Sequence, residues 1–236
     1  MSFKDFIKTE MPEFVWNWHH DIICKEIDRL LFSEERGTPN NLMILAPPRS
    51  SKTTLCSIML PGYTFSLKDI GIFSSSTVIA QYRKRDFMRK FGKHDNVQFF
   101  GVDTPITGRA IDYGIIDLPF ESPSFNSIEI GNKTWDWYCS TYHARKSINA
   151  KTILVCSNTE YSLANYILSR DKNAWTVIRI PALLSPIVST NTSLERSYWE
   201  ANFPTKRLIE ERKLLGDSYW KYTYQQEIKD IPYENP

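Results

Sequence analysis

The sequence predicts an α/β fold in which a mainly parallel sheet is flanked by helices, and two patterns carry this prediction. Short apolar segments typical of buried strands alternate along the chain with segments whose apolar residues recur at helical spacing. The apolar segment 42–45 runs directly into a tight polar loop and then into a helical segment, which is the strand–loop–helix unit of such folds. Strands joined through helices lie parallel in one sheet.

The expected elements follow from these patterns in order. Apolar residues at helical spacing predict a helix over 14–32, which Gly37 and Pro39 separate from the first strand. Further helices are expected at 54–60, 77–91, 163–169, 204–215 and 218–227. Strands are expected at 42–45, 71–74, 97–102, 114–117, 151–156 and 175–180. We therefore divide the chain into a core at 1–185, which includes an N-terminal helical segment, and a small helical subdomain at 186–236.

Composition excludes several classes of protein. Hydrophobic residues make up 42% and aromatic residues 14% of the chain, too many for a disordered protein. No apolar run approaches the roughly 18–20 residues that span a membrane, and the charged start at 1–5 is unlike a signal peptide, so we expect no membrane contact. The four cysteines lie far apart, which argues against a zinc site and for reduced thiols. With a net charge of +2, any DNA-binding surface must be a local patch.

Residues 46–53, Ala-Pro-Pro-Arg-Ser-Ser-Lys-Thr, form the most informative motif. Between a strand and a helix, such a loop cradles phosphates with its backbone N–H groups, while Lys52 neutralises phosphate oxygens and Thr53 joins a Mg²⁺ shell. Ala46 and Ser51 replace both glycines of the usual G-x-x-x-x-G-K-[ST] pattern, and Ser-Lys-Thr also occurs in ordinary loops. The residues expected to contact a nucleotide are Pro48, Arg49, Ser50, Ser51, Lys52, Thr53 and Thr54.

A second motif is the apolar strand 113–117, which ends in Asp117. A carboxylate in this position holds Mg²⁺ beside a phosphate loop, although an Asp that caps the following turn gives the same pattern. Thr53 and Asp117 are therefore the expected metal ligands, and ATP with Mg²⁺ are the expected cofactors.

In these motifs the chain resembles the large terminase subunit of tailed bacteriophages, the ATPase that pumps double-stranded DNA into preformed capsids. The family's Pro-Pro-Arg-x-Gly-Lys-[Ser/Thr] loop is matched at 47–53 apart from Ser51. Its Thr-Gly-Arg-Gly-x-Asp run and the following Ile-Ile-Asp-Asp-Pro strand are matched at 107–119 apart from Ala110 and Leu118. Further landmarks lie at 16–24, 179–182, 198–216 and 224–226. The resemblance covers nearly the whole chain and implies a P-loop NTPase fold of the additional-strand (ASCE) type.

The resemblance also implies roles for single residues. Lys52 and Arg49 would contact the β- and γ-phosphates and Asp117 would hold Mg²⁺, although Arg49 also fits a solvated loop arginine. Arg145 falls where the family keeps an arginine, so it is a candidate for completing the site of a neighbouring subunit. Trp16, Trp18 and His19 lie where the family contacts adenine, but the apolar face of a helix explains them equally well.

Partners and location follow from the same resemblance. We expect binding to double-stranded DNA, the portal protein and the small terminase subunit, and assembly into a homo-oligomeric ring on the procapsid, with the isolated chain monomeric. The expected location is the cytoplasm of an infected bacterial host, with transient attachment to the procapsid and no place in the mature virion. The family's nuclease domain is absent from this sequence, so we expect no DNA cleavage.

Three departures from the family bear on hydrolysis. The family's second acidic residue, which polarises the attacking water, falls at Leu118, and the nearest substitute is Glu121. The family's Thr-Arg-Trp-His coupling segment corresponds to 156–159, where Ser157 or Glu160 remains to contact nucleotide or water. Ser51 replaces the glycine that lets the backbone approach the phosphates.

Two functions of different class therefore stay open. The first is an active packaging ATPase in which another carboxylate takes over the catalytic role, with Glu121 as the first candidate and Glu160 as the alternative. The second is a terminase-like protein that binds nucleotide weakly or not at all and acts as an assembly or DNA-binding partner. A DNA helicase or repair ATPase fits the landmarks less well. The basic helix 77–91 offers Arg83, Arg85 and Arg89 as further arginines that could act in trans, although a solvated basic face also explains them.

Overall fold

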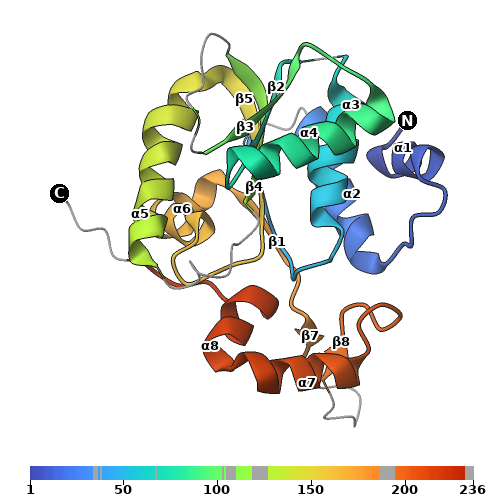
Figure 1. Ribbon diagram of the computed structural model, residues 1–236, viewed down its shortest axis with the longest axis vertical. Helices are drawn as coiled ribbons and strands as arrows, with labels where there is room; N and C mark the ends of the chain where they lie inside the picture. Colours follow the sequence, from blue (N-terminus) through green and yellow to red (C-terminus); the bar gives the residue numbers. More distant parts are fainter. Residues whose placement is uncertain are drawn as a thin grey trace.

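The computed structural model describes residues 1–33, 37, 39–66, 68–102, 104, 110–118, 127–185 and 195–231. At its centre is a six-stranded sheet with the order β3-β2-β4-β5-β1-β6, and all of its strand pairs are parallel (Figure 1). The strands are β1 (Asn41–Leu45), β2 (Ile70–Ser74), β3 (Val97–Gly101), β4 (Ile111–Leu118), β5 (Lys146–Cys156) and β6 (Thr176–Arg179). The predicted α/β class with a parallel sheet is confirmed.

Helices cover both faces of this sheet (Figure 1). The first face carries α1 (Phe3–Glu10), α2 (Trp18–Phe32), the π-helical η1 (Thr54–Met59) with α3 (Leu60–Thr64), and α4 (Thr77–Phe91). The second face carries α5 (Ile128–Trp137), the π-helical η3 (Tyr138–Tyr142) and α6 (Leu163–Asp171). Two short 3₁₀ turns, η4 (His143–Arg145) and η5 (Lys172–Ala174), lead into β5 and towards β6.

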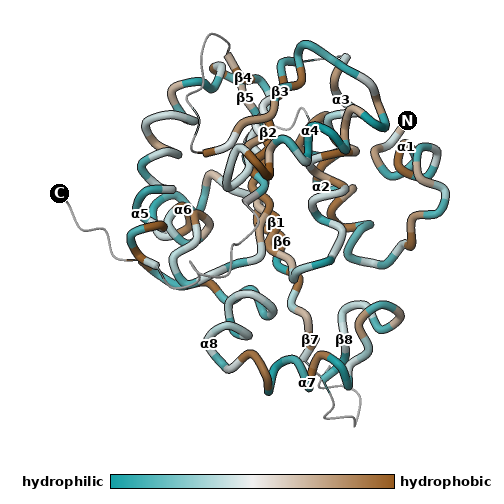
Figure 2. Tube along the Cα trace, in the orientation of Figure 1, coloured by the Kyte–Doolittle hydropathy of each residue, from teal (hydrophilic) through white to brown (hydrophobic). Residues whose placement is uncertain are grey.

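Strand residues alternate between the two helical layers. In β1, Leu42 and Ile44 pack in the core of the first face, whereas Met43 and Leu45 pack in the core of the second. Because a strand turns successive side chains to opposite faces and both faces are covered, every one of these residues must be apolar. Figure 2 shows the result as a brown band along β1 and β6 at the centre of the molecule.

The strand order brings the ends of four strands together. β5 lies between β1 and β4, and Cys156 of β5 is level with both Leu45 and Leu118. On the other side of β4, Ser74 of β2 is level with Asp117. Since parallel strands all end at the same edge, the loop after β1 and the carboxylate of β4 meet there although their strands are not neighbours.

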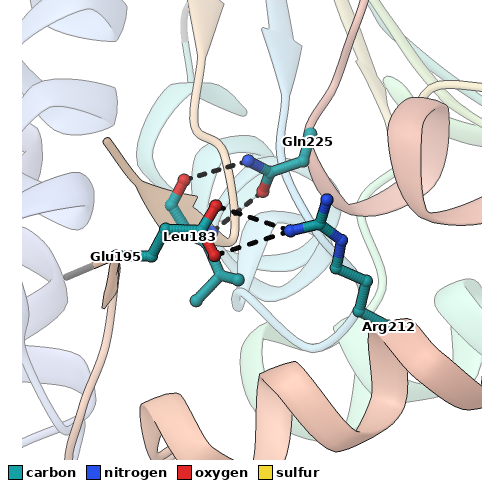
Figure 3. Close-up of polar contacts among 4 residues, drawn as sticks. All are labelled: Leu183, Glu195, Arg212 and Gln225. Atoms are coloured by element: carbon teal, nitrogen blue, oxygen red, sulfur yellow. Dashed lines mark hydrogen bonds and ion pairs between the residues drawn. The ribbon is translucent and has the colours of Figure 1, made fainter. Parts of the chain in front are cut away.

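The C-terminal part lies beneath this edge of the sheet (Figure 1). It contains the strand pair β7 (Leu183–Leu184) and β8 (Arg196–Ser197), then α7 (Thr205–Leu215), α8 (Asp217–Tyr219) and the π-helical η6 (Trp220–Tyr224). The Gln225 side-chain amide donates to the carbonyl of Leu183 at 3.0 Å and accepts its N–H at 2.9 Å, as Figure 3 shows. The side chain of Gln225 thus ties the segment that follows η6 to β7. Arg212 of α7 lies 3.5 Å from Glu195 in the same view.

Most predicted elements are present with altered ends. α4 occupies the predicted range, whereas α2 begins only at Trp18 because Asn17 is its N-cap. The helices α1, α5 and η3 and the short strands β7 and β8 were not predicted. α5 contains Gly131, where a Cβ atom would lie 2.7 Å from the carbonyl oxygen of Tyr161, so only glycine lets this helix approach that loop.

Two further expectations concern the chain as a whole. The expected boundary between 185 and 186 adjoins residues outside the described part, and β7 on one side of it pairs with β8 on the other. Within the described ranges, no helix has the length and apolar character needed to cross a membrane.

Candidate active site

The predicted phosphate loop lies at the carboxyl edge of the sheet and runs straight into a helix. The Ala46 N–H donates to the carbonyl of Cys156 at 3.2 Å, which fixes the start of the loop against β5. Arg49 and Ser51 both have φ of 62°, in the left-handed region that favours glycine. Ser51 therefore holds a left-handed backbone conformation that glycine adopts more easily, at a cost of roughly 1–2 kcal/mol.

Lys52 stands in the first turn of that helix and turns its ammonium group back into the loop. Its Nζ donates to the carbonyl of Pro47 and to Oγ of Ser157, both at 2.9 Å, and Ser157 in turn donates to the carbonyl of Ala46 at 3.0 Å. Burial lowers the pKa of Lys52 to about 8, and the carboxylate of Asp117 opposes that shift. The loop thus encloses a buried cation, which a phosphate group would stabilise.

Asp117 is 1% exposed and faces the same helix. Thr53 Oγ1 donates to its Oδ1 at 3.2 Å, and Ser57 Oγ, from the π-helical segment η1, donates to its Oδ2 at 2.8 Å. The Nε of Arg83 on α4 lies 3.4 Å from the same Oδ2. The two predicted metal ligands are therefore brought together. Ser57 was not among the predicted site residues, and Arg83 was predicted only as an arginine that could act in trans, not as a contact of Asp117 in its own chain.

Three buried polar atoms around this point have no hydrogen-bond partner within the described part of the chain. They are Oγ of Ser50 in the loop, Oγ of Ser74 opposite Asp117, and Nε of Arg83. Buried polar groups normally form hydrogen bonds, and one without a hydrogen bond costs about 1–3 kcal/mol. These three atoms lie at the phosphate loop and beside the acidic strand, and the ion pair of Arg83 with Asp117 compensates only one of them.

The residues present fit a Mg²⁺ ion shared with a nucleotide. Thr53 and Asp117 supply the hydroxyl and carboxylate oxygens that Mg²⁺ prefers. Magnesium at nucleotide sites takes one or two such protein oxygens and completes its shell with phosphate oxygens and water. Among the described residues there is no cluster of three or more His, Cys, Asp or Glu side chains that could form a cage made of protein ligands alone.

The N-terminal helix α2 supports the loop from one side. His19 Nδ1 accepts the side-chain N–H of Asn17 at 3.0 Å, so its Nε2 carries the proton and points to the carbonyl of Ser50 at 3.4 Å. Burial lowers the pKa of His19 to about 3, which keeps the ring neutral. Trp18 instead donates to the carbonyl of Tyr198 at 2.8 Å. His19 thus holds the backbone of the phosphate loop, a role that neither sequence-based interpretation of this helix included.

The C-terminal part contacts the site at two places, at Arg49 of the loop and at the segment that follows β5. The Arg49 guanidinium lies over the ring of Phe203, 5.7 Å from its centre, so this exposed arginine is anchored rather than freely solvated. Beyond Ser157, the backbone N–H of the buried Asn158 donates to Gln226 Oε1 at 2.9 Å, and its carbonyl accepts the hydroxyl of Thr223 at 3.2 Å. These two hydrogen bonds attach residues 223–226 to the segment after β5, in which Ser157 contacts Lys52.

Of the two candidate catalytic carboxylates, the structure describes Glu160 but not Glu121. Glu160 receives a 2.5 Å hydrogen bond from Lys229, whose ammonium also lies 4.2 Å from the ring centre of Tyr161. Its carboxylate is therefore engaged by the C-terminal segment. Glu121 lies outside the described residues, as does the segment 107–109 of the resemblance, and its role stays a prediction.

The candidate arginines lie in three different places. Arg145 is exposed in η4, just before β5, and so sits at the opposite edge of the sheet from Lys52. Arg85 and Arg89 are exposed on α4 and pair with Asp86. Arg83 instead contacts Asp117 of its own chain. A contribution of Arg145 to a neighbouring subunit stays a prediction.

Comparison of the sequence with protein-family models and with curated proteins finds no match. The functional assignment therefore rests on the residues of the site.

Proposed function

We propose that this chain is the ATPase motor domain of a viral terminase large subunit, which hydrolyses ATP to move double-stranded DNA into a procapsid. The observation that supports nucleotide binding best is the meeting of Lys52, Thr53 and Asp117 at one edge of a parallel sheet, beside three buried polar atoms that have no hydrogen-bond partner among the described residues. No other place among the described residues combines a buried lysine with a buried carboxylate and a helix N-terminus.

In this proposal each residue acts on ATP in a defined way. The backbone N–H groups of 49–53 and the ammonium of Lys52 bind the β- and γ-phosphates, while Thr53 and Asp117 hold Mg²⁺. Bound Mg²⁺ would neutralise phosphate charge as the terminal phosphoryl group transfers to water. Arg49, now over Phe203, lies in the loop close enough to the C-terminal part to link nucleotide state to that part.

The terminase assignment goes beyond nucleotide binding and rests on the ordered landmarks of the sequence. The position of β5 between β1 and β4 agrees with the additional-strand arrangement that the resemblance implies. The exposed basic side chains of α4 offer a local surface for DNA phosphates in a chain whose net charge is only +2. DNA, the portal protein, the small subunit and the ring on the procapsid are parts of the proposal.

A second candidate is a terminase-like partner protein that binds nucleotide without efficient hydrolysis. It is favoured by Leu118 at the position of the water-polarising acid and by the engagement of Glu160 with Lys229. Loss of a positioned general base typically lowers a rate by about 10²–10⁴.

Steady-state ATP turnover with Mg²⁺, with and without double-stranded DNA, distinguishes the two functions. The variants are Lys52→Ala, Leu118→Glu and, as a control on an exposed lysine of α7, Lys213→Ala. Turnover that rises with DNA, disappears in Lys52→Ala and persists in Lys213→Ala would support the motor. Nucleotide binding without turnover, together with a gain of activity in Leu118→Glu, would support the partner protein.

A further inference from the structure

Arg83 differs from the other arginines of α4 in where it points. Its side chain is 21% exposed, against 62% for Arg85 and 71% for Arg89, and its Nε lies 3.4 Å from Oδ2 of Asp117. The two exposed arginines pair with Asp86 on their own helix, and Arg85 also lies 5.1 Å from the ring centre of Tyr82, on the same helix. The helix therefore turns one of its cations into the candidate nucleotide site.

The contact between Arg83 and Asp117 is an ion pair without a hydrogen bond. Oδ2 of Asp117 already accepts the hydroxyl of Ser57 at 2.8 Å, and Oδ1 accepts that of Thr53 at 3.2 Å. The Nε of Arg83 is fully buried and has no hydrogen-bond partner among the described residues. A guanidinium that served only as the counter-ion of this carboxylate would form direct hydrogen bonds with it, as arginine–carboxylate pairs usually do.

The charges at the site do not balance. Among the described residues, two cations, Lys52 and Arg83, face a single carboxylate, Asp117, and the positive charge of Arg83 also acts on Lys52. Surplus positive charge in a buried site favours a bound anion. The phosphate loop binds the phosphates nearest the helix N-terminus, so a cation on the far side, beside the acidic strand, lies nearest the terminal phosphate.

We propose that Arg83 is a phosphate-binding arginine that acts in its own subunit: it neutralises Asp117 while the site holds no nucleotide, and it contacts the γ-phosphate of ATP once Thr53 and Asp117 hold Mg²⁺. This inference rests on the proposed binding of Mg²⁺–ATP. It deepens that proposal because it predicts that the site distinguishes ATP from ADP, which lacks the phosphate that Arg83 would contact.

The test is calorimetric titration of the full chain with Mg²⁺–ATP and Mg²⁺–ADP. Arg83→Gln should weaken ATP binding about 10- to 100-fold, the size of a lost charge-assisted hydrogen bond, and ADP binding by less than about 3-fold. Arg212→Gln removes the same charge from α7, where Arg212 is exposed and pairs with Glu195, and should change neither affinity. Equal weakening of ATP and ADP in Arg83→Gln, or no weakening of either, would overturn the inference.

A second comparison covers the case in which Arg83→Gln fails to fold because Asp117 is left buried without its cation. Asp117→Asn and the double variant Arg83→Gln with Asp117→Asn both avoid that unpaired carboxylate. The ratio of ATP to ADP affinity should be lower in the double variant than in Asp117→Asn alone, and equal ratios would overturn the inference. Failure of the wild-type chain to bind either nucleotide would instead contradict the proposed function on which the inference depends.

Discussion

The ammonium group of Lys52 donates a 2.9 Å hydrogen bond to the hydroxyl of Ser157, 105 residues further along the chain. The hydroxyl of Ser157 in turn donates to the carbonyl of Ala46. Hydrogen bonds therefore join the two ends of the phosphate loop to the residue that follows β5. This relationship exists because β5 lies next to β1 in the sheet and ends level with it. It makes the stability of the loop depend on a residue outside the loop.

Ser157→Ala should therefore lower the free energy of unfolding by about 1–3 kcal/mol, because the buried ammonium of Lys52 loses one of its two acceptors. Urea unfolding measures the change. Ser140→Ala is the matched control, since Ser140 also bonds to a backbone carbonyl but on the exposed side of η3. Equal stability of Ser157→Ala and the wild type would show that Lys52 does not depend on this hydroxyl.

Substitutions at Ser51 test the conformation of the phosphate loop. With φ of 62°, this position accepts glycine without strain, tolerates serine at a cost and disfavours a β-branched residue. Ser51→Gly should keep or improve both stability and ATP affinity, whereas Ser51→Val should lower the free energy of unfolding by roughly 1–2 kcal/mol and weaken ATP binding. Thermal unfolding and nucleotide titration of the two variants check this. A valine variant that matches the glycine variant would argue against the left-handed backbone at this position.

Acid sensitivity tests the support given by α2. Burial lowers the pKa of His20 to about 4, whereas an exposed histidine of the unfolded chain binds its proton near pH 6.5. Between these values the unfolded state holds more protons, so the free energy of unfolding should fall as the pH drops from about 6.5 to about 4. The neighbouring His19 contributes in the same direction.

His20→Gln separates this titration from the structural role of the residue. His20 Nδ1 accepts the backbone N–H of Asn17 at 3.0 Å, a cap that glutamine also provides. The variant should match the wild type near pH 7.5 and lose less stability on acidification to about pH 5, as urea unfolding at the two values would show. The same loss in both proteins would mean that folding does not lower the pKa of His20.

The catalytic carboxylate can be assigned by a pair of matched substitutions. If the chain hydrolyses ATP, Glu121→Gln should abolish turnover and spare nucleotide affinity, because the general base would be lost while the binding groups remain. Glu160→Gln should retain most of the turnover, since Glu160 is engaged by Lys229. The reverse pattern in an ATPase assay would transfer the catalytic role to Glu160.

The sequence predicts that Lys52 and Asp117 meet at this site, and the physical reason is clear. The strand–loop–helix unit around Lys52 and the acid-ended strand at Asp117 are local signals, and a parallel sheet brings all such ends to one edge. The contacts of Ser157, Arg83 and His19 were not predictable in this way, since common residue types at distant positions carry no spacing signal. α5 was missed because Gly131 lowers helix propensity, and its reason, the close approach of Tyr161, exists only in the fold.

The most direct test of the account is calorimetric titration of Mg²⁺–ATP into the wild-type chain and into Lys52→Ala. Lys52 is the buried cation of the loop, so its ammonium should supply a large part of the phosphate binding. The account predicts Mg²⁺-dependent binding by the wild type that disappears in Lys52→Ala, with both proteins folded by circular dichroism. No binding by the wild type, or equal binding by the folded variant, would contradict the central claim that residues 46–54 form a nucleotide site.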